Sequence, residues 1–312
     1  MKVMKNPYVL LTLAMLFWAG NFVLSKAVVV EVPPVTLAFG RWALAFLVVL
    51  PFAYRHLRRD SLSLRRAWKV LIPISLLGIT CFNTLIYVGL QTTTAINSLL
   101  LQSFFPVVVP VLAFVFFREK LGWGAVVGIL VSLLGTLWLV AQGDLNRLRS
   151  ASFNPGDGWV FAAVVLYAGY ALLLRFRPTV HALSFLAVTF GLGLVMLLPF
   201  LVVEWLTYAP PLLTLELVLA FGYLAVFPSL VSYLFFNEGV RQIGATTAGL
   251  FSHLVPTFGS LMAIFFLGER FHGYHAIGIG LILAGIGLVV GNRRRTEQSS
   301  GIKKAAPVRK PQ

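Results

Sequence analysis

The fold is decided by the stretch FFPVVVPVLAFVFFREKLGWGAVVGILVSLLG at residues 104–135, which recurs 150 residues later as LVPTFGSLMAIFFLGERFHGYHAIGIGLILAG at residues 254–285. Identical residues keep this spacing along and upstream of the stretch: Gly89, Ala95, Pro106, Ala113, Phe116, Glu119, Gly128, Ile129 and Gly135 recur as Gly239, Ala245, Pro256, Ala263, Phe266, Glu269, Gly278, Ile279 and Gly285. The chain therefore consists of two half-chains with one common pattern. Both halves are built from apolar runs of membrane-spanning length.

Composition places the chain in a membrane. Of its 312 residues, 59% are apolar and 11% are charged, and the mean hydropathy is +0.89, whereas a soluble domain carries roughly a quarter charged residues. The net charge of +15 does not indicate nucleic-acid binding, because the basic residues lie in short loops between apolar runs. The single cysteine, Cys81, excludes an intramolecular disulfide and a cysteine metal cluster. The first apolar run is longer than a signal-peptide core and is expected to remain as a helix.

About 20 apolar residues cross a bilayer as one helix. On this basis we predict ten spans, near residues 7–30, 33–54, 69–90, 93–117, 122–141, 158–175, 180–203, 215–237, 245–267 and 272–291. Five spans per half is an odd number, so the second half must enter the membrane in the opposite sense. The predicted fold class is an all-α integral membrane protein whose ten transmembrane helices form two inverted five-helix repeats.

The expected domain organisation follows from this count of spans. The first repeat covers residues 1–141, an outer linker covers 142–157, and the second repeat covers 158–291. The basic tail, residues 292–312, is poor in apolar residues and is expected to be disordered on the cytoplasmic side, where it can touch anionic lipid headgroups.

Five motifs keep their order and spacing along the chain: FWAGNFVLSK at 17–26, PPVTLAFGRWALA at 33–45, FFPVVVPVLAFVFFREKLG at 104–122, GDGWVFAAVVLYAGYALLLR at 156–175 and HLVPTFGSLMAIFFLGERF at 253–271. Together they resemble the EamA family of the drug/metabolite transporter superfamily, and the resemblance reaches to Asn292. It implies a ten-helix permease with two five-helix repeats. Cargo in such families ranges over amino acids, other metabolites and drugs, so the resemblance does not identify the cargo.

Candidate cargo residues come in pairs from the two halves. In an inverted-repeat transporter the cargo site lies near the midplane between the halves, where polar and aromatic side chains face a cavity. Six helices supply such pairs: Trp18 and Asn21 align with Tyr167 and Tyr170, Asn83 and Tyr87 with Tyr233 and Asn237, and Gln102 and Ser103 with Ser252 and His253. We predict that they line a cavity for a small amphiphilic solute. The alternative is that they only join helices through hydrogen bonds.

Charged residues inside the spans are few. His253 is the only ionisable residue near the middle of a span, and it either carries a coupling proton or stays as a neutral, hydrogen-bonded imidazole. No Asp or Glu occupies the middle of a span, unlike in the small multidrug exporters of the same superfamily, so drug–proton antiport of that type is disfavoured. Lys26 and Arg41 either attract an anionic cargo or, as the favoured interpretation, extend to the interface.

Other pairs that recur in both halves are assigned structural roles. Glu119 and Glu269 precede the last helix of each half, where a carboxylate complements the helix end and can pair with Arg118 or Arg270. Two GxxxG spacings also lie in these helices, at Gly124 with Gly128 and at Gly287 with Gly291. Close packing within the chain is favoured over dimerisation for both.

These features predict a secondary transporter of a small organic metabolite, an amino acid or a related amphiphilic solute, that works by alternating access. Export follows from the family resemblance alone. The alternative is an integral-membrane enzyme or a channel, but the sequence lacks a histidine-rich metal cluster, a G-x-S-x-G motif, a phosphate loop and rings of like charge. We expect no catalytic residue, metal or cofactor. The expected partners are the cargo and the lipid bilayer, with no nucleic acid, and the choice between monomer and homodimer stays open.

Charge asymmetry predicts the orientation in the cell (inner) membrane. With a cytoplasmic N-terminus, the inner side receives Lys2, Lys5, Arg55, Arg58, Arg59, Arg65, Arg66, Lys69, Arg118, Lys120, Arg175, Arg177, Arg241 and the basic tail, while the outer loops keep only Arg147, Arg149 and Arg270. Both termini are therefore predicted to be cytoplasmic. In a Cys81→Ser background, a membrane-impermeant thiol reagent should label a cysteine placed at Asn154, but not one at Gln312, in intact cells. Labelling at position 312 from outside would overturn this orientation.

Overall fold

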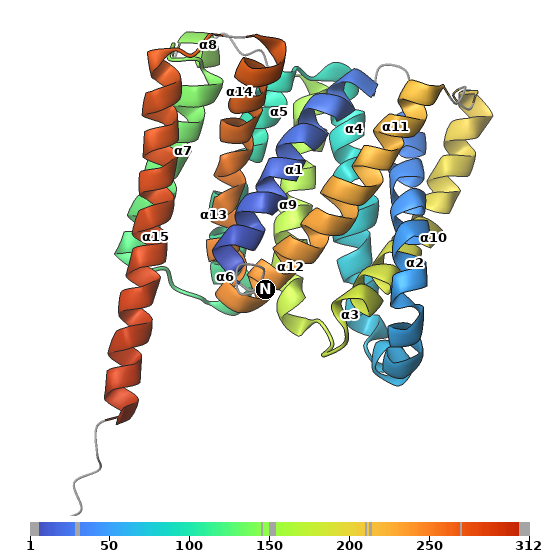
Figure 1. The fold of residues 1–312 in the computed structure, drawn as a ribbon, viewed down its shortest axis with the longest axis horizontal. Coiled ribbons are helices and arrows are strands. Elements are labelled where there is room, and N and C mark those ends of the chain that lie inside the picture. Colours follow the sequence, from blue (N-terminus) through green and yellow to red (C-terminus); the bar gives the residue numbers. More distant parts are fainter. Residues whose placement is uncertain are drawn as a thin grey trace, which may run out of the picture.

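The computed structural model describes residues 6–28, 32–144, 146–149, 154–209, 211, 214–268 and 270–305, and these residues form a bundle of long helices without strands (Figure 1). Each of the ten predicted spans is helical, which confirms the all-α membrane fold. Within the described residues, nine helical stretches are long and apolar enough to cross a membrane, and a shorter apolar helix, Pro7–Asn21, precedes them.

The two halves have the same order of helices. The first contains α1 (Pro7–Val28), α2 (Pro34–Arg66), α3 (Trp68–Ser75) with α4 (Phe82–Thr92), α5 (Ala95–Gln102) with α6 (Phe105–Phe117), and α7 (Trp123–Val140). After the short helix α8 (Asn146–Arg149), the second contains α9 (Pro155–Leu173), α10 (Ala182–Thr207), α11 (Leu215–Leu224) with α12 (Ser232–Ile243), α13 (Ala245–Leu250) with α14 (Leu254–Leu267), and α15 (Gly273–Ala305). The start of α1 and the end of α15 lie on one side of the bundle, the terminal side, and α8 lies on the other, the α8 side (Figure 1).

Two helices are longer than predicted. α2 continues twelve residues beyond the expected end of its span at residue 54, to Arg66, because an exposed, arginine-rich extension still buries Leu64 against the bundle. α15 continues to Ala305, so residues 292–305 of the tail are helical rather than disordered. Lengthening an existing helix carries no nucleation penalty, and Arg, Lys, Gln and Glu are good helix formers.

The same irregular turns occur in both halves. A π-helical turn, Leu76–Cys81, joins α3 to α4, and a second one, Ala225–Val231, joins α11 to α12 at the repeat-related position. A break at Ser103 and Phe104 separates α5 from α6, and the 3-10 turn Phe251–His253 separates α13 from α14. Because π turns are rare and occur frequently at functional sites, these spans are the first place to look for a site.

The last helices of the two halves pack against each other through glycines. A Cβ atom added at Gly135 would lie 2.7 Å from the carbonyl oxygen of Gly278, and one added at Gly128 would lie 2.7 Å from that of Gly285. Gly278 is the repeat partner of Gly128, and Gly285 is that of Gly135, so the contacts are reciprocal, as across a twofold axis. Gly124 also faces this interface, through Asn292, whereas Gly287 and Gly291 have no atom within 4 Å of an added Cβ. Close packing within the chain thus holds for the first GxxxG spacing only.

The glycine interface yields a matched pair of variants two residues apart on α15. Gly285→Ala should lower the free energy of unfolding by about 1–3 kcal/mol, because the new methyl would lie against backbone atoms of α7 that cannot rotate away. One of these is the amide nitrogen of Ser132, 2.6 Å away. Gly287→Ala meets open space and should leave stability unchanged or slightly raised. Thermal unfolding midpoints of the purified protein in detergent compare the two. Equal midpoints would contradict the assigned interface.

Candidate functional site

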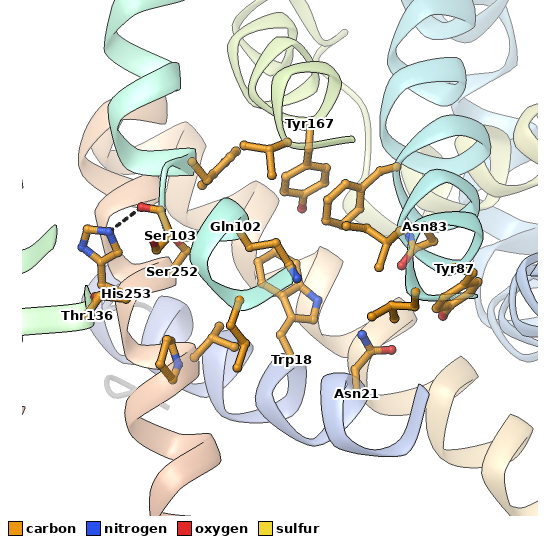
Figure 2. Close-up of a pocket in the computed structure, with 18 of the residues that line it drawn as sticks. Trp18, Asn21, Asn83, Tyr87, Gln102, Ser103, Thr136, Tyr167, Ser252 and His253 are labelled. Carbon is orange, nitrogen blue, oxygen red and sulfur yellow. Dashed lines mark hydrogen bonds between the residues drawn. The ribbon is translucent and has the colours of Figure 1, made fainter. Parts of the chain in front are cut away.

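A cavity lies at the centre of the bundle, and both halves line it (Figure 2). It is walled by Trp18, Asn21, Arg41, Phe82, Asn83, Ile86, Tyr87, Leu90, Leu99, Gln102, Ser103, Phe105, Thr136, Val164, Tyr167, Tyr233, Ser252, His253, Val255 and Pro256. Its volume is about 80 Å³, which is room for a few water molecules. Nine of the eleven predicted cargo residues are in this wall, together with His253, the candidate for proton coupling. That they bind cargo stays a prediction.

Repeat partners meet inside the cavity wall. The rings of Trp18 and Tyr167, which align between the halves, lie edge to face with centroids 5.9 Å apart. His253 Nε2 lies 2.9 Å from the carbonyl oxygen of Ser103, its own repeat partner. A residue touches its symmetry mate only near the symmetry axis. The cavity is therefore built on the axis that relates the two halves.

Aromatic rings form the middle of the wall. The ring of Tyr167 stacks on that of Phe82 with centroids 4.1 Å apart and also contacts Phe105. The indole Nε1 of Trp18 donates a 3.0 Å hydrogen bond to the carbonyl of Pro228, in the second π-helical turn. The Tyr233 hydroxyl donates a 2.7 Å hydrogen bond to the carbonyl of Gly78, in the first. The π-helical turns thus hold two of the aromatic side chains in place.

Tyr170 and Asn237 are the two predicted cargo residues outside the cavity wall. They lie one layer behind it, where the Tyr170 hydroxyl donates a 2.6 Å hydrogen bond to Asn237 Oδ1. Their chain neighbours Ala171 and Glu238 line a separate vestibule on the terminal side. This vestibule shares no lining residue with the central cavity. The Tyr170–Asn237 pair therefore separates the two spaces.

Charged residues reinforce this closure on the terminal side. Arg177 lies 3.6 Å from the Glu238 carboxylate, which also pairs with Arg241, and Arg175 lies 2.5 Å from Glu119. The partner of Glu119 is thus Arg175 and not Arg118, since its carboxylate reaches a neighbouring loop. Glu269 lies outside the described residues.

The opposite end of the cavity leads toward the α8 side. A second cavity of about 220 Å³ shares the wall residues Leu99, Val255 and Pro256 with the central one. It extends to Gln142 and Tyr274, at the ends of α7 and α15 nearest α8. In this conformation a second cavity adjoins the central one toward the α8 side, whereas the vestibule on the terminal side shares no wall residue with it.

Arg41 is the cavity residue that sequence reasoning interpreted wrongly. It does not extend to the interface, because its side chain is buried with only 1% exposed. Nε donates to Ser229 Oγ at 2.5 Å, and Nη1 lies 2.8 Å from each of Asn21 Oδ1, Asn83 Oδ1 and the Tyr87 hydroxyl. The signal available in the sequence was a lone arginine inside an apolar span. The side chain of Lys26 lies outside the described part of the structure.

His253 is held at both ring nitrogens. Nε2 must carry the hydrogen to bond the Ser103 carbonyl, which leaves Nδ1 to accept from the Ser132 hydroxyl 2.7 Å away. This pattern fits a neutral imidazole, fully hydrogen-bonded within the protein. The same ring also ties the broken span of the second half to α7 of the first.

A membrane-spanning helical bundle with a cavity on the axis between its inverted halves defines the class of membrane transporters. A profile of the EamA-like transporter family matches this chain twice, over residues 5–141 and 154–291. The chain belongs to this family, which is one of transporters and not of enzymes.

Relatives support the same assignment. The uncharacterized transporter YyaM of Bacillus subtilis is 29% identical over 285 residues, which cover 90% of this chain and 92% of the relative. A protein of Chlamydia trachomatis serovar L2 named S-adenosylmethionine/S-adenosylhomocysteine transporter is 25% identical and covers 87% of this chain and 85% of its own length. A solved crystal structure superimposes with a TM-score of 0.75 at 19% identity, over 93% of this chain and 97% of that one. The last similarity shows the fold alone.

Proposed function

We propose that this protein is a secondary transporter that moves a small amphiphilic metabolite, an amino acid or a related solute, by alternating access around the central cavity. The observation that carries the proposal is the wall of that cavity, to which both halves contribute repeat-related side chains. Cargo held on the axis would contact side chains of both halves. We place the termini in the cytoplasm and the direction of transport outward.

The unmatched polar groups of the wall support a cargo that both stacks and hydrogen-bonds. Asn83 Nδ2, the Tyr167 hydroxyl and Ser252 Oγ are buried and have no hydrogen-bond partner within the described part of the chain. Buried polar groups without a partner cost about 1–3 kcal/mol each, so a cargo that satisfies them gains affinity. Aromatic faces beside them suit a planar or apolar moiety. Amino-acid-derived solutes, including the S-adenosylmethionine named for one relative, combine these features.

Alternating access follows from the inverted repeats. The terminal side is closed by the Tyr170–Asn237 pair and the ion pairs of Glu238, while a second cavity adjoins the central one toward the α8 side. Exchanging the conformations of the two halves would close the α8 side and open the terminal side. The cavity must also widen for cargo to enter, since about 80 Å³ is too small for a metabolite.

Counterflow in proteoliposomes tests the proposed function. The wild type should show saturable counterflow of at least one member of a panel of amino acids and S-adenosylmethionine, with no chemical change to the solute. Trp18→Ala and Tyr167→Ala should weaken uptake about fivefold or more, because each loses a stacking contact worth on the order of 1 kcal/mol.

Exposed residues of the same types serve as controls for these variants. Trp123→Ala and Tyr208→Ala remove side chains that are 84% and 56% exposed, and should keep wild-type uptake. Non-saturable flux would indicate a channel, and a changed solute an enzyme. Unchanged uptake kinetics in both cavity variants would contradict the proposal that cargo binds in this cavity.

Proton coupling through His253 stays a prediction. His253→Gln preserves hydrogen bonding to Ser103 and Ser132 but cannot titrate. It should abolish accumulation driven by a pH gradient and spare downhill counterflow. Accumulation that persists in the variant would make the imidazole purely structural. A wild type that ignores a pH gradient would be a facilitator or coupled to another ion.

A further inference from the structure

Arg41 is a buried cation surrounded by neutral groups. Its four hydrogen-bond acceptors are two amides and two hydroxyls, contributed by α1, α4 and the second π-helical turn. The ion pairs of the described residues involve Glu119 and Glu238, and neither joins Arg41. Neutral oxygens solvate a guanidinium without neutralising it. A charge inside a membrane is costly and is usually paired, so an anion is the expected partner of Arg41.

The guanidinium has donor capacity to spare. Both hydrogens of Nη1 are already engaged, since three oxygens lie 2.8 Å from this nitrogen. Nη2 has no hydrogen-bond partner among the described residues, although Arg41 borders the cavity. The two hydrogens of Nη2 therefore remain for an anionic oxygen, with which arginine forms charge-assisted hydrogen bonds.

Two further groups of the cavity wall lack hydrogen-bond partners among the described residues. Asn83, which is 3% exposed, uses its Oδ1 on Arg41 but leaves its Nδ2 unmatched. Tyr167, also 3% exposed, has an unmatched hydroxyl. In Figure 2, Asn21, Asn83 and Tyr87 gather at one end of the cavity, His253 lies at the opposite end and Tyr167 between them. An anionic oxygen at the Arg41 end would find an amide donor beside the guanidinium.

The repeat does not duplicate this charge. The dipeptide Phe39-Gly40 of α2 recurs as Phe190-Gly191 of α10, which places Leu192 at the repeat position of Arg41. One half therefore fills this position with an apolar side chain and the other with a cation. A feature present in one repeat only is better explained by the cargo than by the architecture.

We propose that the cargo carries a carboxylate group that binds Arg41, with Asn83 Nδ2 as an additional donor. This inference rests on the proposed function and names the chemical class of its cargo. A single carboxylate matches the single charge of the guanidinium. A dianionic phosphate would need a second cation, and the described cavity wall supplies no other arginine or lysine, while His253 is committed to Ser103 and Ser132. The apolar part of the cargo then lies against the aromatic rings.

The decisive variant is Asn83→Asp, which replaces an amide by a carboxylate of the same shape, 2.8 Å from Nη1. If Arg41 only ties helices together, an internal counter-charge should preserve binding of the cargo. If Arg41 binds a cargo carboxylate, the new carboxylate occupies its place. We expect Asn83→Asp to raise the thermal unfolding midpoint and to lose carboxylate binding. Arg41→Gln should lose the binding as well, and Asn83→Asp keeps the test decisive should that variant not fold.

Binding is measured by thermal-shift titration of the purified protein with matched acid and amide pairs: benzoate with benzamide, indole-3-acetate with indole-3-acetamide, and N-acetylphenylalanine with its amide. In the wild type, and in the exposed α2 variant Arg59→Gln, at least one acid should bind ten times more tightly than its amide. In Asn83→Asp that ratio should fall to within twofold. A wild-type ratio within twofold for every pair, or a tenfold ratio kept in Asn83→Asp, overturns the proposal.

The outcome is separable from that of the proposed function. Saturable counterflow of a solute without preference for acids would support the proposed transport and contradict the carboxylate site. Acid binding that depends on Arg41, without counterflow of any solute, would support the carboxylate site and contradict the proposed transport.

Discussion

The hydrogen bond between His253 and the carbonyl of Ser103 joins two residues that hold the same place in the two halves. A bilayer offers no water to a carbonyl freed by a helix break, so the protein must supply a donor. The break arises beside Pro106, which has no amide hydrogen, and the amides of Val107 and Val108 both bond to Phe104. The imidazole from the other half bonds the carbonyl that is left over. The broken spans thereby meet on the axis, and the cavity lies beside them.

The features that occur in both halves form a symmetric frame around a charge that occurs in one half only. The glycine contacts of α7 with α15, the π-helical turns and the broken spans all occur in pairs, while Arg41 occurs once. Amide and hydroxyl oxygens around the guanidinium stabilise it much as water would, but they do not neutralise its charge. In a low-dielectric space this charge attracts an anion strongly. With a neutral His253 at the far end, the cavity is electrically polar along its length. Under our proposals, the symmetric pairs explain how cargo is moved, and the charge of Arg41 explains which cargo binds.

The sequence predicted the frame better than the charge. Pairing residues by the repeat worked for Trp18 and Tyr167, because residues of equal depth in inverted halves converge on the axis. Tyr170 lies three residues further along α9, about 4.5 Å, which places it behind the cavity wall. For Arg41, position in a span gives depth but not the direction of the side chain, and that direction depends on packing against α4 and the second π-helical turn. The extension of α2 was missed because hydropathy registers the end of the bilayer and not the end of a helix.

Repeat symmetry also relates Arg41 to the closure of the cavity. On the terminal side, Tyr170 and Asn237 bond directly to each other. Their repeat partners are Asn21 and Tyr87, which are not joined by a direct bond but are each held by Nη1 of Arg41. The guanidinium therefore lies between the two residues whose symmetry mates close the opposite end of the cavity. A cargo anion that draws the guanidinium toward itself would release Asn21 and Tyr87 to form the bond that their partners already make. Binding and closure would then depend on the same side chain.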